Sequence, residues 1–81
     1  MTTPVSPALE LDCRGQVCPM PVIELARRIT DVEVGEVVAV VADDPAARHD
    51  VPAWCRMREQ EYVGDDAADD GVPRFLVRRV S

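Results

Sequence analysis

Cys18 lies where an extended segment gives way to a helical one, in the stretch LDCRGQVCPMP over residues 11–21. The first N–H groups of a helix lack partners within the helix, and its dipole is positive there, so a thiol at that end is biased toward its thiolate. Pro19 and Pro21 suit a first turn, where a missing N–H is tolerated, so the helix can start at either proline. With Cys18 as the N-cap, the Met20 N–H is the expected donor to the sulfur. This pattern predicts nucleophilic sulfur chemistry at Cys18.

Burial is the alternative explanation for a cysteine, because free cysteine is among the most buried residue types. Cys18 is flanked by polar and turn residues before it and by prolines after it, which indicates a surface loop. Cys13 is in phase with the apolar residues of a strand, and Cys55 with those of a helix. We therefore expect Cys13 and Cys55 to pack in the core, although either could resolve a sulfur bond at Cys18.

The residue pattern does not predict a second reactive group beside Cys18. His49, the only histidine, lies in a polar stretch typical of a solvated side chain, so a protease-like Cys–His pair has no support. Four residues separate Cys13 from Cys18, which matches neither the CxxC redox motif nor a common zinc motif. We expect neither a metal nor a cofactor. Asp43 and Asp44 are typical of a turn or a helix cap, with partner docking as the second interpretation.

Length and composition exclude several classes of protein. Eighty-one residues allow one domain, and 47% hydrophobic with 30% charged residues excludes a disordered chain. The formal net charge is -6 and every basic residue is an arginine, which argues against unaided binding to nucleic acid or to an anionic membrane. The odd count of three cysteines and the lack of a recognisable signal peptide favour free thiols in the cytoplasm.

The residue patterns predict a flexible leader over residues 1–8 and a single domain over residues 9–81. The expected elements are a strand over 9–13, a helix over 19–30, a strand over 37–42, a helix within 46–58 that Asp50 can cap, a strand over 61–64, an acidic loop over 65–71 and a strand over 73–80. This βαβαββ order predicts an α/β (α+β) two-layer sandwich, a four-stranded mixed sheet with both helices on one face. Two layers enclose no cavity of the usual ligand size, so the chemistry should take place at the surface.

Three motifs are specific when taken together: LDxxGxxCPxP over residues 11–21, DDPA over 43–46 and DxPxxC over 50–55. With them the chain resembles the TusA (SirA-like) family of small sulfurtransferases over about residues 9–80. The resemblance implies the same sandwich and a cytosolic sulfur carrier. In such a carrier Cys18 accepts sulfane sulfur as a persulfide from a cysteine desulfurase or a rhodanese-type donor, and passes it to an acceptor protein.

The resemblance also suggests roles for neighbouring residues. The motif residues expected to position the cysteine are Asp12, Gly15, Pro19, Met20 and Pro21. The residues expected at a docking surface are Arg14, Arg27, Asp43 and Asp44. Gln16 stands where the family usually has an apolar residue, and the chain has no lysine, so the sequence does not choose among family roles such as tRNA thiolation and cofactor supply.

A sulfurtransferase is the leading interpretation, and two others stay open. One is a thiol-based redox or regulatory adaptor, which would bond Cys18 reversibly to Cys13 or Cys55 and take up no sulfur. The other is a subunit that only docks, for which Cys18 would be dispensable.

Overall fold

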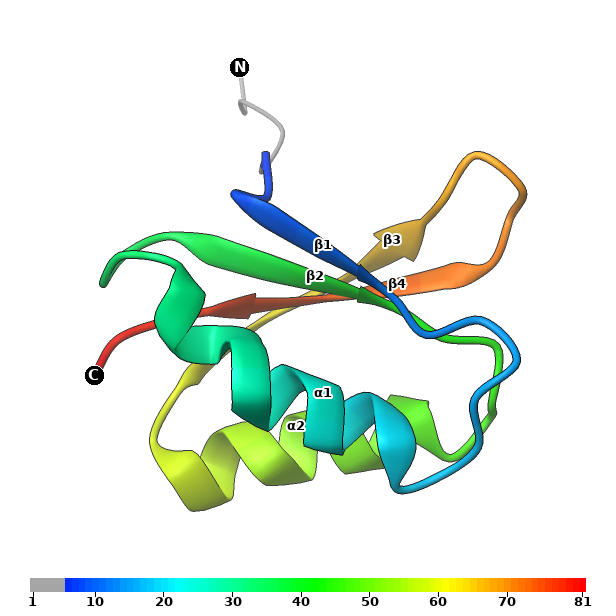
Figure 1. The fold of residues 1–81 in the computed structure, drawn as a ribbon, viewed down its shortest axis with the longest axis horizontal. Helices are drawn as coiled ribbons and strands as arrows, with labels where there is room; N and C mark the ends of the chain where they lie inside the picture. The colour runs from blue at the N-terminus through cyan, green and yellow to red at the C-terminus, as the bar shows by residue number, and fades with distance from the viewer. Residues whose placement is uncertain (1–5) are drawn as a thin grey trace.

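Four strands and two helices alternate along the chain in the predicted order (Figure 1). The computed structural model describes residues 6–81, so the predicted leader falls largely outside the described residues. The elements are β1 Leu9–Asp12, α1 Met20–Arg28, a 3-10 turn Ile29–Asp31, β2 Val37–Val41, α2 Ala47–Arg58, β3 Glu61–Ala67 and β4 Pro73–Arg78. No helix within residues 6–81 has the length and apolar character needed to cross a membrane.

The strands form one mixed sheet in the order β1-β2-β4-β3, and both helices cover one of its faces (Figure 1). β1 and β2 are parallel, whereas the other two strand pairs are antiparallel. The predicted two-layer sandwich is confirmed. Because the carboxyl ends of parallel strands meet at the same edge, the segments that follow β1 and β2, residues 13–19 and 42–46, lie next to each other.

The core fixes β2 against the helices. All five residues of β2 are buried, as predicted for an interior strand. Val38 and Val40 belong to one apolar cluster with Leu25 of α1, Val51 of α2 and Phe75 of β4. Full burial of such a side chain contributes about 1.5–3 kcal/mol. The helices are thus held firmly beneath the strand whose end supports the Cys18 loop.

The opposite face of the sheet carries a smaller apolar cluster centred on Ala39. Arg74 spans the strands on this face, because its guanidinium pairs with Asp66 of β3 at 2.7 Å and with Glu10 of β1 at 3.0 Å. Ion pairs therefore connect β4 to β3 and, across β2, to β1 on the side that the helices leave open.

The predicted acidic loop over residues 65–71 is wrong in its first half, because β3 continues to Ala67. Arginines from other elements neutralise the acids that enter the strand: Arg48 pairs with Asp65 at 2.8 Å, and Arg74 pairs with Asp66. Pairs of opposite charge stabilise adjacent strands, so aspartates that would otherwise favour a loop are accommodated in β3.

Candidate functional site

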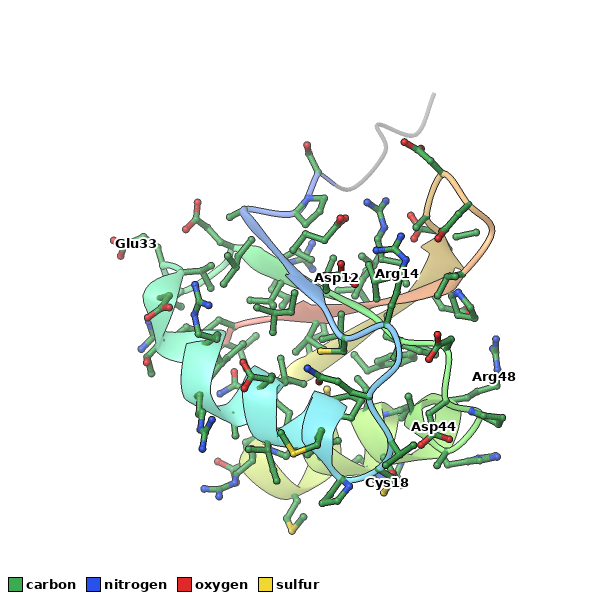
Figure 2. The ribbon with its side chains drawn as sticks, turned by 45° about the vertical axis from the view of Figure 1, so that its right-hand side comes forward. Asp12, Arg14, Cys18, Glu33, Asp44 and Arg48 are labelled. Carbon is green, nitrogen blue, oxygen red and sulfur yellow. The ribbon has the colours of Figure 1, made fainter. Side chains whose placement is uncertain are left out.

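Cys18 lies in the loop that joins β1 to α1, at the edge of the sheet where β1 and β2 end (Figure 2). Its side chain is exposed, whereas Cys13 and Cys55 are each only 1% exposed. All three thiols are free. Burial raises the pKa of Cys13, and it raises the pKa of Cys55 to about 11. Cys18 is therefore the thiol that a partner can reach.

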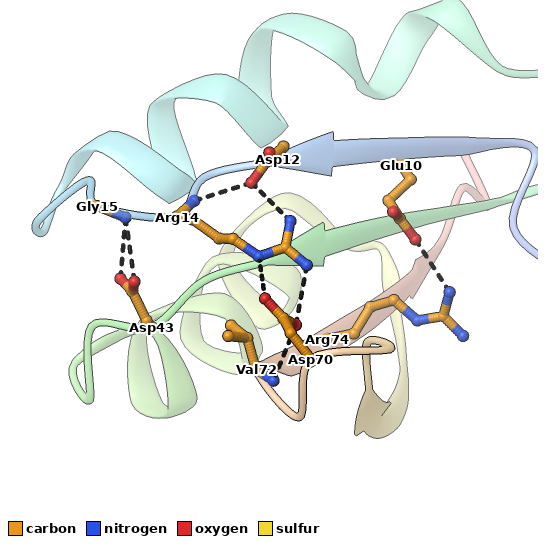
Figure 3. A network of polar contacts seen from close by, with 8 residues as sticks. All are labelled: Glu10, Asp12, Arg14, Gly15, Asp43, Asp70, Val72 and Arg74. Atoms are coloured by element: carbon orange, nitrogen blue, oxygen red, sulfur yellow. Dashed lines mark hydrogen bonds and ion pairs between the residues drawn. The ribbon is translucent and has the colours of Figure 1, made fainter.

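Gly15 turns the Cys18 loop. Its φ of +76° lies in the left-handed region that favours glycine. The Gly15 N–H donates to both carboxylate oxygens of Asp43, at 3.1 and 3.2 Å (Figure 3). Asp43 lies two residues after the end of β2, so this contact ties the turn of the loop to the end of the central strand.

Asp44 holds the backbone of the reactive residue. Its Oδ2 accepts the Cys18 N–H at 2.6 Å, and its Oδ1 accepts the Ala46 N–H at 3.1 Å. These bonds hold the pKa of Asp44 below its usual range, so the carboxylate stays ionised near neutral pH. Asp43 and Asp44 lie in the turn between β2 and α2, as one of the two sequence interpretations predicts, whereas the N-cap of α2 is Ala46 and no side chain of residues 6–81 caps it. The docking role of Asp43 and Asp44 stays a prediction.

The Cys18 thiol faces a carboxylate of α2. Its Sγ donates to Asp50 Oδ2 at 2.7 Å. This hydrogen bond, followed by partial desolvation and the negative charges of Asp50 and Asp44, raises the pKa of Cys18 above its ordinary value. Asp50 therefore favours the protonated thiol.

The Cys18 cap, which is expected if the helix starts at Pro19, is absent because α1 begins at Met20. Pro19 is the N-cap of α1, and the Met20 N–H donates to the Val17 carbonyl at 2.9 Å rather than to the sulfur. The expected bias toward a thiolate is wrong, because the thiol lies before the cap and bonds to Asp50. The Cys18–Pro19 peptide bond is cis.

Arg14 links the Cys18 loop to the turn between β3 and β4. Its guanidinium bonds Asp12 at 3.0 Å and both carboxylate oxygens of Asp70, at 2.9 and 3.0 Å (Figure 3). Hydrogen bonds from Arg14 hold the pKa of both aspartates below their usual range. Arg14 and Asp12 thus brace the loop. The other predicted docking arginine, Arg27, lies on the surface of α1 and pairs with Glu24 at 3.3 Å.

The remaining motif residues lie at the start of α1. Pro21 is buried, and Met20 is 37% exposed. Residues 6–81 expose five large apolar side chains, and three of them are near Cys18. Val17 and Met20 are close to it in sequence, and Met57 lines the same groove. Exposed apolar side chains that gather in this way mark interaction surfaces. The surroundings of Cys18 suit contact with another protein.

A groove of about 260 Å³ opens beside Cys18, between α1 and α2. Its lining is mostly apolar and comprises Cys18, Pro19, Val22, Asp50, Ala53, Trp54 and Met57. Within residues 6–81, no group of three or more acidic, histidine or cysteine side chains could hold a metal ion.

Asp50 is the functional candidate that the sequence interpretation missed. It was expected to cap the second helix, but α2 begins at Ala47, which places Asp50 within the first turn with its carboxylate at the thiol. A signal existed, since Asp50 begins the DxPxxC motif. The sequence also contained a weaker signal for Met57 as a groove residue, because Met57 is an apolar residue between Arg56 and Arg58.

Comparisons with known proteins match most of the chain. A family model described as Sulfurtransferase TusA matches residues 9–79, which include every residue of the site. A protein of Archaeoglobus fulgidus, named as a candidate sulfur carrier protein, is 41% identical over 71 residues, which cover 88% of this chain and 92% of that protein. The crystal structure of a SirA-like protein from Desulfitobacterium hafniense has a TM-score of 0.75 at 26% identity, covering 90% of this chain and 99% of that one.

Proposed function

Because the chain belongs to the TusA family of sulfurtransferases, we propose that it carries sulfur as a persulfide on Cys18, taking it from one protein and passing it to another. One observation carries the choice of residue: the exposed Cys18 Sγ donates to the Asp50 carboxylate at 2.7 Å. The burial of Cys13 and Cys55 supports the same choice.

In uptake, Cys18 attacks the outer sulfur of a donor persulfide and passes its proton to Asp50 in the same step. A bond forms between Cys18 Sγ and that sulfur, while the S–S bond of the donor breaks and the donor leaves as a thiolate. The proton held by Asp50 passes to this thiolate. A thiol and a persulfide are converted into a persulfide and a thiol, so no external oxidant or reductant is needed.

Delivery runs through the same groups in the opposite direction. A thiolate of the acceptor attacks the outer sulfur on Cys18, the new persulfide forms on the acceptor, and Cys18 departs as a thiolate. The proton of the acceptor thiol passes to Asp50 as the acceptor thiolate forms, and Asp50 returns it to the departing sulfur of Cys18. The raised pKa of Cys18 makes this proton useful, because an unprotonated thiolate of high pKa is a poor leaving group.

The partners follow from this chemistry. We propose a cysteine desulfurase or a rhodanese-type protein as the donor, and a relay protein or enzyme as the acceptor, in a route such as tRNA thiolation or cofactor synthesis. Three free thiols suit a reducing cytoplasm. The net charge of -6 favours handing sulfur to a protein over binding an RNA directly.

Sulfur uptake from a cysteine desulfurase and cysteine tests the proposal. Intact-mass measurement should show the gain of one sulfur atom in the unchanged chain and none in Cys18→Ser. Cys13→Ser and Cys55→Ser are the matched controls and should keep the gain. A gain that survives Cys18→Ser would overturn the proposal, as would its loss only in the controls. A redox adaptor would instead gain no sulfur from any donor.

A further inference from the structure

A second groove, of about 290 Å³, adjoins the one at Cys18. It is lined by Ala26, Ile29, Thr30, Trp54, Arg58 and Gln60. Trp54 lines both grooves, so the two grooves adjoin at its side chain between α1 and α2. We name the pair the interhelical groove: it begins at Cys18 and Asp50 and ends at Arg58 and Gln60.

The interhelical groove changes in chemistry along its length. The end at Cys18 carries the acidic Asp50, and the middle is apolar around Trp54. The far end carries Arg58, whose guanidinium pairs with no carboxylate of residues 6–81. A ligand that fits all three parts needs a group that reacts with the thiol, an apolar side chain and an anion, in that order.

The spacing of these parts matches an extended peptide. α2 rises about 1.5 Å per residue, so Trp54 lies about 6 Å and Arg58 about 12 Å along the axis from Asp50. An extended chain advances about 3.3 Å per residue, and its alternate side chains share one face. If a cysteine of a bound peptide lies against Cys18, the residue two positions along the peptide therefore lies near Trp54, and the residue four positions along lies near Arg58.

We propose that the interhelical groove binds an extended, cysteine-bearing segment of a partner protein, with an apolar residue two positions and a carboxylate four positions from the reactive cysteine. The proposal rests on the proposed function, because it assumes that sulfur passes between that cysteine and Cys18. Charge complementarity supports this occupant, because the carboxylate of the bound segment lies at Arg58 and away from Asp50 and Asp44.

Binding of short peptides tests the proposal, with Trp54, the only tryptophan of the chain, as the fluorescent reporter. The probes are acetyl-Ser-Gly-Leu-Gly-Glu-amide and its reversed sequence, in which serine replaces the reactive cysteine, each paired with a version that carries lysine in place of glutamate. In one of the two orders, the glutamate peptide should shift the fluorescence at a concentration about fivefold lower than the lysine peptide does. This is the difference in affinity that one exposed ion pair provides.

Charge reversal at Arg58 supplies the decisive variant. Arg58→Glu should invert the preference, so that the lysine peptide binds more tightly. Arg56→Glu is the matched control, because it makes the same charge change on the same helix outside the groove lining, and it should retain the preference for glutamate. Equal binding of both peptides in both orders would overturn the proposal, as would the same effect of the two substitutions.

The outcomes separate this proposal from the proposed function. If no donor loads Cys18 with sulfur, the proposed function fails, and the groove proposal fails with it. If Cys18 loads normally but the peptides do not discriminate, only the groove proposal fails. A fluorescence shift that follows protein concentration without peptide would mean that a second copy fills the groove, which also overturns it.

Discussion

At the scale of single residues, Cys18 is controlled by a carboxylate more than by a helix. The N-terminal dipole of α1 is equivalent to about half a unit charge, and α1 begins only at Met20. Asp50 carries a full unit of negative charge and bonds the sulfur directly, at 2.7 Å. The nearer and larger charge dominates, which explains why the pKa of Cys18 is raised although a helix follows.

Replacement of Asp50 should make Cys18 more acidic. Asp50→Asn removes the negative charge that raises the pKa of Cys18, so more thiolate should be present at neutral pH. The rate of Cys18 alkylation against pH measures this, and its rise should move to lower pH. Asp69→Asn, in the turn between β3 and β4, is the control and should leave the profile in place. An unchanged or opposite shift in Asp50→Asn would contradict the account.

Gln16 should be a weak point of the Cys18 loop. Its Oε1 is buried and accepts no hydrogen bond from residues 6–81. Burial of an unpaired polar group costs about 1–3 kcal/mol, so Gln16→Leu should raise the free energy of unfolding by about 1 kcal/mol. Urea denaturation measures it. Gln60→Leu is the opposite control, because Gln60 Oε1 accepts the Val80 N–H at 2.8 Å, and its loss should destabilise. A less stable Gln16→Leu would refute this interpretation.

At the scale of elements, the sequence was sufficient to predict where the site lies in the fold, but not which residues contact Cys18. The βαβαββ order predicted the mixed sheet, and the residues around Cys18 predicted a surface loop before α1. The contact between Asp43 and this loop was found only in the structure. The thiol contact depended on where α2 begins. A start at Ala47 instead of a cap at Asp50 turns that carboxylate toward Cys18. β3 was predicted too short because the aspartates of residues 65–66 are typical of a loop, and the arginines that neutralise them belong to other elements.

The turn at Gly15 should matter for reactivity beyond its effect on stability. Gly15 and Gly35 both have positive φ, and an added Cβ would meet no atom within 4 Å at either. Each change to alanine should therefore cost about 1 kcal/mol of stability from the backbone alone. Gly15→Ala should in addition slow sulfur uptake by Cys18, whereas Gly35→Ala should not. Equal uptake rates in the two variants would show that the turn does not position the thiol.

At the scale of the whole molecule, the chain buries its core on one side of a small sheet and leaves its reactive atom outside. The surface is rich in ion pairs, which individually contribute at most about 1 kcal/mol. The polar contacts of the surface together make the stability of the fold depend on pH. Hydrogen bonds hold the pKa of four aspartates below their usual range, namely Asp12, Asp44, Asp66 and Asp70.

Acid should therefore destabilise the fold. A carboxyl whose pKa is lower in the folded state adds stability above its unfolded pKa, here 3.8, and that stability is lost as pH falls through the lowered value. The melting temperature should fall below about pH 4. Asp44→Asn should be less stable near neutral pH and show a shallower fall, whereas Asp69→Asn should behave as the unchanged chain does. A melting temperature that stays level in acid would contradict this.

The position of transferred sulfur tests the central claim most directly. Cleavage after arginine separates the three cysteines into residues 1–14, 15–27 and 49–56. After loading from a donor with isotope-labelled sulfur and trapping by alkylation, mass spectrometry should find the label on residues 15–27, attached to Cys18. Addition of an acceptor thiol before trapping should move the label to the acceptor. Label on either other peptide, or label that stays on the chain when the acceptor is added, would contradict a persulfide relay through Cys18.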